Sequence, residues 1–267
     1  MVTWVVEANV FSETCFDRMI AHLKKQTIPF HVVKVVPFVH EIDGHVPEIK
    51  GPVVVYGSIG VQKLARKHGW EPGVWAAPTE LASRLLLGDL YLNGDLTSLA
   101  MSRVEDHILD KGLLDEDIFI KPNADTKEFA GLVMKGSEFS PWYEKMKQIG
   151  YLDKNDFEVV ISSAKTIGCE WRIVVVDGKI SSYSLYRQWQ RVMPEHHILP
   201  EVEALVMEAH SRFSPSPVYV IDVCQVGNGF KIIEYNTFNS AGLYECEVER
   251  IIDDVTEHVE ASCRKTA

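Results

Sequence analysis

Residues 218–242 read VYVIDVCQVGNGFKIIEYNTFNSAG, and the order of apolar and polar residues in this stretch decides the fold. Two apolar runs flank the glycine-containing loop at 227–229, a pattern that predicts a β-hairpin. In the second run, Glu234 and Asn236 are two residues apart, so their side chains share one face of the strand. The sequence therefore predicts a carboxylate and an amide that project together from an otherwise apolar strand.

The position of Asp222, in the first run, depends on the register of this hairpin. A three-residue loop at 227–229 places Asp222 opposite Glu234. A two-residue turn at 228–229 is also favoured and places Asp222 opposite Tyr235, on the other face. Two buried carboxylates must share a proton or hold a cation, and carboxylate and amide oxygens suit magnesium. The hairpin is thus a candidate magnesium site, and a half-exposed hairpin whose acidic residues face water is the alternative.

A lysine ends the apolar, strand-like run at 118–121, and Pro122 stops further strand pairing. The ammonium group of Lys121 at such a strand end can serve as a point charge on phosphate groups. A gatekeeping lysine at a strand tip is the alternative interpretation. Lys127 and Lys135 are weaker candidates for phosphate binding nearby.

A second pair of charged residues, Glu170 and Arg172, precedes a wholly apolar run and shares one strand face. The Asp-Gly dipeptide at 177–178 predicts a tight hairpin after this run, and Arg187 follows the returning strand. Arginine stays charged and binds phosphate oxygens through two parallel donors. Both arginines are therefore candidate phosphate ligands, with a structural Glu170–Arg172 ion pair at a sheet edge as the alternative.

The chain divides into two regions by the pattern of its elements. Short apolar strands alternate with helices at the start, which predicts a small, mostly parallel α/β domain over residues 1–88. From residue 89 the strand-like runs are longer and more often adjacent, which predicts an α+β domain with antiparallel sheets over residues 89–267. Helical periodicity in this second region marks four runs, at 97–110, 138–149, 200–213 and 245–260.

Together these motifs resemble the ATP-grasp family, and in particular a compact branch of it found in phages and bacteria. The resemblance covers about residues 90–260 and rests on the Lys-Pro strand end at 121–122, the Glu-x-Arg strand at 170–172, Asp222, and the Glu-x-Asn motif at 234–236. The α/β domain in front fits the usual N-terminal domain of that family. The resemblance implies an ATP-grasp fold with ATP and Mg²⁺ as cofactors.

The resemblance also implies roles for individual residues. The catalytic residues would be basic side chains that face the phosphates, namely Lys121, Arg172 and Arg187. The ATP contacts would come from the strand ends and from the strand that links the two lobes, namely Lys121, Glu158, Val160, Ile161, Glu170 and Arg172. The metal ligands would be Asp222, Glu234 and Asn236, and the substrate would lie against the small-residue loop that contains Asn239, Ser240, Ala241 and Gly242.

The implied reaction is the ATP-dependent joining of a carboxylate to an amine. The carboxylate attacks the γ-phosphate of ATP, and the resulting acyl phosphate reacts with the amine, which leaves an amide or peptide bond and ADP. Catalysis of this kind is mostly positioning and electrostatic stabilisation, so no protein nucleophile is required. A kinase or phosphotransferase on the same fold is the first alternative, and a non-catalytic nucleotide-binding protein is the second.

Two features depart from the family pattern. The upstream phosphate-binding lysine of the family has no evident counterpart, and Arg103 is the candidate replacement. The linking strand continues through residues 162–165 without the usual acidic contact to ribose. Both departures concern the nucleotide contacts rather than the metal site.

The bulk composition bounds the partners of the protein. The formal net charge of −11, with basic residues only in short clusters, argues against nucleic acid as a partner, so a small molecule or a peptide is the expected substrate. We expect no membrane span, because no apolar run reaches about 18 residues. Five scattered cysteines without a CxxC pair indicate reduced thiols and a cytoplasmic location. A homodimer is compatible with the sequence.

Overall fold

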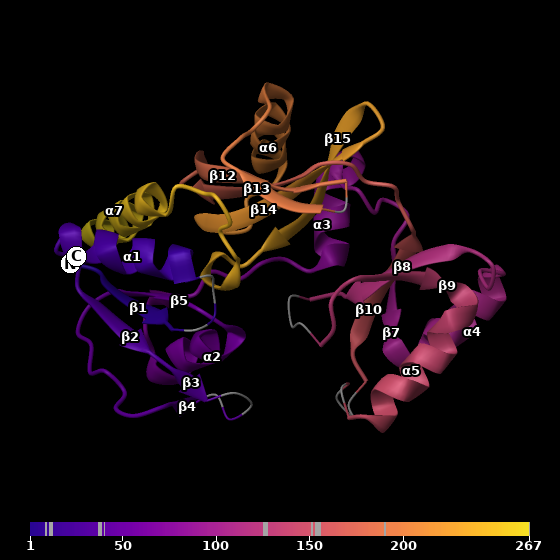
Figure 1. Ribbon diagram of the computed structural model, residues 1–267, viewed down its shortest axis with the longest axis horizontal. Helices are drawn as coiled ribbons and strands as arrows, with labels where there is room; N and C mark the ends of the chain where they lie inside the picture. Colours follow the sequence, from indigo (N-terminus) through magenta and orange to yellow (C-terminus); the bar gives the residue numbers. More distant parts are fainter. Residues whose placement is uncertain are drawn as a thin grey trace.

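The computed structural model of the protein describes residues 1–8, 10, 13–36, 39, 41–124, 128–150, 152, 156–189 and 191–266. Figure 1 shows three groups of elements: a parallel sheet with its helices at the lower left, a five-stranded antiparallel sheet at the top, and a four-stranded antiparallel sheet at the right. The five-stranded sheet lies between the other two. None of the described helices combines the length and the apolar character that crossing a bilayer requires.

The N-terminal group is a parallel sheet with strand order β2-β1-β5-β6, as the alternating pattern predicts. Its elements are β1 (Thr3–Glu7), α1 (Glu13–Lys25), β2 (Phe30–Val33), β5 (Val53–Tyr56), α2 (Ile59–His68) and β6 (Pro72–Gly73), with the small β3 (Val35–Val36) and β4 (Glu41–Ile42) pair beside them. The hydroxyl of Ser58 accepts from the amide of Gly60, and Gly69 ends α2 in the left-handed conformation.

The four-stranded antiparallel sheet has the order β7-β10-β8-β9. Its elements are β7 (Thr97–Ala100), α4 (Val104–Lys111), β8 (Asp117–Pro122), β9 (Leu132–Lys135), α5 (Phe139–Gln148) and β10 (Glu158–Ser163). Both helices pack on this sheet in one apolar core. The helix predicted over 97–110 is wrong in its first part, because residues 97–100 pair with β10 as an edge strand. Strand pairing overrides the local pattern there.

The five-stranded antiparallel sheet has the order β13-β12-β11-β14-β15. Its strands are β11 (Glu170–Val176), β12 (Lys179–Gln188), β13 (Arg191–Glu195), β14 (Val218–Val226) and β15 (Gly229–Asn236). The predicted Asp-Gly turn joins β11 to β12, and both residues have positive φ, at 51° for Asp177 and 74° for Gly178. This conformation matches the twist of a tight hairpin.

The two faces of the five-stranded sheet have different neighbours. One face packs on α6 (Pro200–Arg212) and α3 (Glu80–Leu87), and this apolar core includes Ile173, Ile221 and Val206. On the other face, the apolar ends of the strands pack against α7 (Val248–Thr266) and the parallel sheet. The polar ends of the same strands, on that same face, are therefore left to form a site.

Helix α3 lies before the predicted domain boundary at residue 88 but packs against α6 and β15 of the five-stranded sheet. At the opposite end of the chain, α7 packs beside α1 of the N-terminal group, as Figure 1 shows at the left. Elements thus cross the predicted division in both directions, and the division at residue 88 stays a prediction.

Candidate active site

The β14–β15 hairpin brings the three predicted metal ligands together. Asp222 pairs with Glu234, and the Nδ2 atom of Asn236 lies 3.1 Å from Asp222 Oδ2 and 3.0 Å from Glu234 Oε1. Asp222 is buried, whereas the carboxylate of Glu234 is 24% exposed. Two carboxylates and an amide on one face form a set of oxygen donors that is open toward solvent on the Glu234 side.

The register of this hairpin differs from both predicted forms. The turn is the two-residue loop at 227–228, since Val226 pairs with Gly229, and not a loop at 227–229 or 228–229. An irregularity between the Val223 and Asp222 pairs then leaves Ile233 as one extra residue in β15. Such a bulge re-aims the side chains beyond it, so Asp222 still faces Glu234.

Arg172 lies next to Asp222 on the adjacent strand and holds it in a two-point ion pair. Its Nε and Nη2 atoms donate to the two carboxylate oxygens at 2.9 and 2.7 Å, and its Nη1 donates to the carbonyl of Gly242 at 3.0 Å. The guanidinium also lies over the stacked rings of Tyr186 and Tyr244. Burial disfavours its charge, but Asp222 outweighs burial and keeps the pKa of Arg172 above its ordinary value. In this conformation Arg172 orients Asp222.

Lys121 reaches across from the four-stranded sheet to the five-stranded sheet. Its ammonium donates to Glu234 and, at 2.9 Å, to Glu80 Oε1 in the first turn of α3. Burial lowers the pKa of Lys121, but Glu234 and Glu80 together raise it above its ordinary value. For Glu234, burial raises the pKa and Lys121 lowers it by more, so this carboxyl is held below its ordinary value. The lysine is therefore charged and shared by two carboxylates.

Sequence reasoning missed Glu80, a buried carboxylate with 6% exposure. Burial raises the pKa of Glu80, and the hydrogen bonds from Lys121 and from the Tyr91 hydroxyl oppose that effect. The local signal was only an acidic residue after the helix cap Thr79, a position that acidic residues favour at any helix N-terminus. Its burial against Lys121 depends on the packing of α3 against β15, which no local pattern reports.

The predicted Glu170–Arg187 side of the site also forms. Glu170 is buried and accepts hydrogen bonds from Tyr186 at 2.7 Å and from Arg187 Nη1 at 3.2 Å. Arg187 itself is 43% exposed, so its remaining donors point to open space. Of the two predicted arginines, Arg187 is the one available to a ligand in this conformation.

Two cavities meet at Lys121, between the two antiparallel sheets. The first, of about 360 Å³, has an apolar part lined by Leu92, Phe119 and Ile233 and a charged part at Arg187. The second, of about 450 Å³, is lined by Glu80, Pro122, Phe129, Tyr235 and Asn236 among others. Both cavities include Lys121, Gly131 and Glu234 in their walls. An elongated molecule with an apolar end and an anionic end fits this arrangement.

The predicted adenine contacts in β10 lie differently. The main chain of residues 158–161 pairs with β7 on one side and with β8 on the other, so the strand is central in its sheet. The carboxylate of Glu158 accepts a hydrogen bond from Asn123 at 2.9 Å, Val160 packs in an apolar core, and Ile161 lines a different cavity. These side chains do not line the two cavities between the sheets. The residues that cross to β11 do line them, through Lys165 and Ile167.

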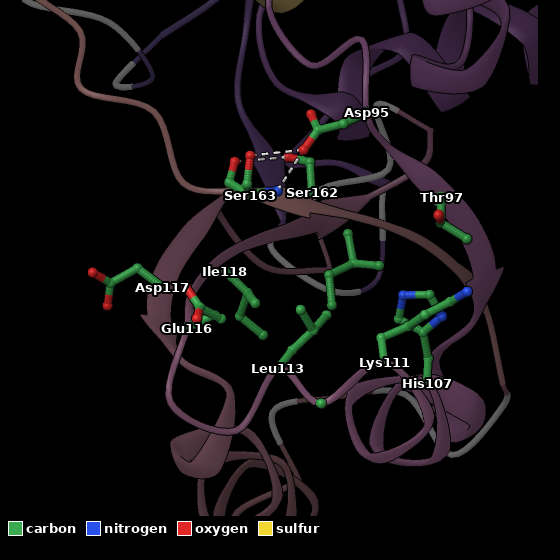
Figure 2. A pocket seen from close by; sticks show the side chains of 12 residues that line it. Asp95, Thr97, His107, Lys111, Leu113, Glu116, Asp117, Ile118, Ser162 and Ser163 are labelled. Atoms are coloured by element: carbon green, nitrogen blue, oxygen red, sulfur yellow. Dashed lines mark hydrogen bonds between the residues drawn. The ribbon is translucent and has the colours of Figure 1, made fainter.

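Figure 2 shows the cavity beside Ile161, which measures about 460 Å³ and lies on the α4 side of the four-stranded sheet. His107 and Lys111 of α4 line one wall, and Asp95 and Ser163 close the upper end. Asp95 accepts from the amide and hydroxyl of Ser163 at 2.9 and 2.7 Å and from Lys165. This cluster ties together the two segments by which the chain passes between the antiparallel sheets.

The predicted substrate loop forms the short helix η4 (Phe238–Ser240) and the residues after it. Asn239 is fully buried, and its amide bonds to the carbonyls of Val55 and Gly73 and to the amide of Trp75. The prediction of a substrate contact does not fit this side chain, because its polar atoms are committed to the N-terminal group. Ser240 is half-buried, and the carbonyl of Gly242 accepts from Arg172.

Other predicted cations lie away from the cavities. Arg103 is 70% exposed and pairs with Asp106 one turn later, so it does not replace the missing upstream lysine. Lys135 pairs with Asp117 at 3.1 Å. Lys127 lies outside the described residues. The second ammonium group that lines the cavity wall is Lys165, which the sequence interpretation did not single out.

A pair of antiparallel sheets with cavities and a Lys, Asp, Glu and Asn cluster between them defines an ATP-grasp protein. A family model of the ATP-grasp domain, family 3 of one clade of these domains, matches residues 29–255, and the chain belongs to this family. No curated protein matches the sequence.

Solved structures of ATP-grasp proteins share the fold. The D-alanine–D-alanine ligase from Bacillus anthracis complexed with ATP has 18% identity and a TM-score of 0.64, over 100% of both chains. The D-cycloserine synthetase DcsG has 14% identity and a TM-score of 0.68, over 97% of this chain and 100% of that one. The ATP-grasp ligase PsnB complexed with a minimal precursor, Mg and ADP has 13% identity and a TM-score of 0.53, over 97% and 98%. At these identities the likeness concerns the fold alone.

Proposed function

We propose that the protein is an ATP-dependent ligase that joins a carboxylate to an amine with release of ADP. The observation that carries the proposal is the Lys121–Glu234–Asn236–Asp222 cluster at the junction of two cavities between the sheets. The structural likeness to two amide-forming ligases of the same superfamily supports an ATP-dependent ligase at that level. The nature of the acid and of the amine lies beyond what these neighbours convey.

The two cavities suit the two ends of a nucleotide. The apolar wall with Leu92, Phe119 and Ile233 offers a surface for a base, and Lys165 lies on the same wall. The charged end, at Lys121 and Arg187, offers cations for the phosphates. Because the second cavity continues beyond Lys121, the terminal phosphate would lie beside Glu234 and Asn236.

The donor set fits Mg²⁺. Two carboxylates and an amide oxygen, from Asp222, Glu234 and Asn236, are hard oxygen ligands of the kind that magnesium prefers alongside water and phosphate. Among the described residues, no group of three or more His, Cys, Asp or Glu side chains lies together as a metal site, so the amide is needed to complete this set. When bound, the metal would neutralise negative charge on the phosphates and orient the terminal one.

The residues of the chain then have distinct roles. Lys121 binds the phosphates as a buried ammonium, and Arg187 offers free donors to the transferred group. Arg172 fixes the carboxylate of Asp222 through both oxygens, so that the metal ligand is pre-oriented. The substrate acid attacks the terminal phosphate, and the acyl phosphate that forms is then attacked by the amine with loss of phosphate.

The partners belong to the same proposal. We expect a small-molecule or peptide acid as substrate rather than nucleic acid, since the net charge is −11. A cytoplasmic location follows from the cysteine pattern and stays a proposal, as does a homodimer.

Calorimetric titration of the wild type with ATP, with and without Mg²⁺, tests the site. We expect binding that requires Mg²⁺ and that weakens by more than about 100-fold in Glu234→Gln, because a metal ligand and the partner of Lys121 are both changed. Glu249→Gln is the matched control, since Glu249 forms its ion pair with Arg18 on α7 and α1, away from the cavities. Pools of amino acids and small acids are then screened for ADP release. A wild type that binds no ATP in the presence of Mg²⁺ contradicts the proposal.

A further inference from the structure

Lys121 has two carboxylate partners, and only Glu234 belongs to the predicted metal set. The second partner, Glu80, lies 2.9 Å from the ammonium and is 6% exposed. An ammonium group between two carboxylates carries one positive charge against two negative ones. One of these two carboxylates is therefore free to change partner without leaving Lys121 unpaired.

Glu80 is held more firmly than Glu234. Its second oxygen accepts from the hydroxyl of Tyr91, and its own main-chain amide donates to the carbonyl of Asn123 at 2.8 Å. Tyr91 in turn forms a bridge with Ile232 of β15, and the amide of the next residue, Leu92, donates to the Ile232 carbonyl at 2.8 Å. The Glu80 carboxylate is thus fixed both to the strand that carries Glu234 and to the loop that follows Lys121.

Glu234 has two uses that conflict. In the ligand-free protein it binds Lys121, and in the proposed function it binds Mg²⁺. A metal ion that recruits Glu234 must remove this carboxylate from a buried lysine, which is costly if the lysine is left without a partner.

We propose that Glu80, fixed by Tyr91, is the positioning residue that retains Lys121 when Glu234 turns to the metal, so that the site exchanges partners instead of leaving a buried charge unpaired. This inference rests on the proposed function and extends it to residues of α3 and of the segment after it. Lys121 keeps one carboxylate throughout and uses its remaining hydrogen for phosphate. Glu80 touches neither the metal nor the nucleotide in this scheme and acts through Lys121.

The exchange predicts a specific pattern in nucleotide binding. Without the Glu80 charge, Glu234 is the sole carboxylate on Lys121, so Mg²⁺ competes with a stronger ion pair. We expect Glu80→Gln to bind Mg²⁺–ATP about tenfold more weakly and to need a higher Mg²⁺ concentration for half-maximal binding. Binding of adenosine, which has no phosphate, stays unchanged, whereas a general distortion of the cavities would weaken adenosine as well.

The experiment is calorimetry of ATP and adenosine binding at a series of Mg²⁺ concentrations. The proteins compared are the wild type, Glu80→Gln, Tyr91→Phe, the double variant, and Glu249→Gln as a control outside the cavities. Tyr91→Phe loses one hydroxyl and should shift ATP binding in the same direction by about threefold. Because Tyr91 acts through Glu80, the double variant should be no weaker than Glu80→Gln alone. If Glu80→Gln does not fold, Tyr91→Phe carries the test.

Three outcomes overturn the exchange. ATP binding by Glu80→Gln that equals or exceeds that of the wild type makes Glu80 a bystander or a competitor of phosphate. A parallel loss of adenosine binding makes it a structural residue. Effects of the two substitutions that simply add separate Tyr91 from Glu80. A wild type that binds no Mg²⁺–ATP is a different result, because it overturns the proposed function before any variant is compared.

Discussion

Two ion pairs of the site differ in where their members come from. Arg172 and Asp222 lie on neighbouring strands of one sheet, in register, with two hydrogen bonds between them and with little exposure. Lys121 and Glu234 come from different sheets and meet across the cavities, and Glu234 is 24% exposed. The first pair is part of the sheet, and the second pair joins two sheets.

The difference assigns the two pairs to different tasks. A pair fixed by strand register cannot separate without breaking the sheet, so Arg172 and Asp222 form a constant part of the site. A pair between sheets can exchange partners, and Glu80 supplies the alternative for Lys121. The following predictions test this contrast, in order of decreasing effect.

Removal of Arg172 should have the largest effect on stability. Arg172→Ala leaves Asp222 buried without its partner, and we expect the free energy of unfolding to fall by about 3–5 kcal/mol. Urea denaturation followed by circular dichroism measures this change. Arg18→Ala is the matched control, because Arg18 makes the same two-point contact with Glu249 at 34% and 40% exposure, where the loss should stay within about 1 kcal/mol. Equal losses in the two variants would contradict the structural role of Arg172.

Removal of Asn239 should rank second. Asn239→Ala leaves the buried carbonyls of Val55 and Gly73 and the amide of Trp75 without a partner, at a cost of about 2–3 kcal/mol. Nucleotide affinity of the folded variant should match the wild type, because Asn239 faces the N-terminal group. A stable Asn239→Ala protein with impaired turnover would instead restore the predicted substrate contact.

Removal of Lys121 should cost less stability but should respond to metal. Lys121→Met leaves two carboxylates facing each other, and we expect a loss of about 1–2 kcal/mol, since Glu234 can turn to solvent. Adding Mg²⁺ should recover part of this loss, because the metal replaces the missing positive charge between the carboxylates. Thermal denaturation with and without Mg²⁺ measures the recovery. Lys135→Met, an exposed pair outside the cavities, should show neither effect, and a recovery in Arg172→Ala would erase the contrast between the pairs.

The smallest effect concerns Asp95, between the segments that connect the sheets. Burial raises its pKa, but Lys165 and Ser163 lower it by more and hold the pKa of Asp95 at about 2. A depressed carboxyl pKa stabilises the fold above its unfolded value, near 3.9, and this stability is lost as the pH falls toward 2. Because Asp95 is 46% exposed, we expect only about 1 kcal/mol.

Unfolding of Asp95→Asn between pH 2 and 7 checks this expectation. The variant should be less stable than the wild type at neutral pH and should lose less stability between pH 4 and pH 2. Asp110→Asn, at an exposed position of α4, is the control that should follow the wild type. Identical acid limbs for Asp95→Asn and the wild type would remove Asp95 from the connection between the sheets.

Local patterns predicted much of this site because its residues follow strand periodicity. Glu170 with Arg172, and Glu234 with Asn236, are two residues apart, so each pair had to share a strand face. The facing of Asp222 and Glu234 was predicted correctly although the loop was not, because the bulge at Ile233 compensates for the shorter turn. A bulge of one residue leaves no clear mark in an apolar run.

Long-range packing set the parts that local patterns missed. Glu80 precedes Lys121 by 41 positions and meets it only because α3 packs on β15. The first turn of the predicted helix at 97–110 became strand β7 because β10 offered it an edge. Asn239 lies in a small-residue loop of the expected kind, yet contacts with Val55 and Gly73 turn it inward.

The sequence by itself determined the strands, the tight turns, the separation into parallel and antiparallel regions, and the polar residues that end the apolar strands. These features depend on alternation and turn chemistry over a few residues. Only the tertiary structure decided which carboxylate reaches Lys121, which arginine is held in a buried ion pair and which asparagine is buried. The reason is physical: ion pairs and buried amides are selected by contacts between elements far apart in the chain, and the energy of those contacts is absent from any short stretch.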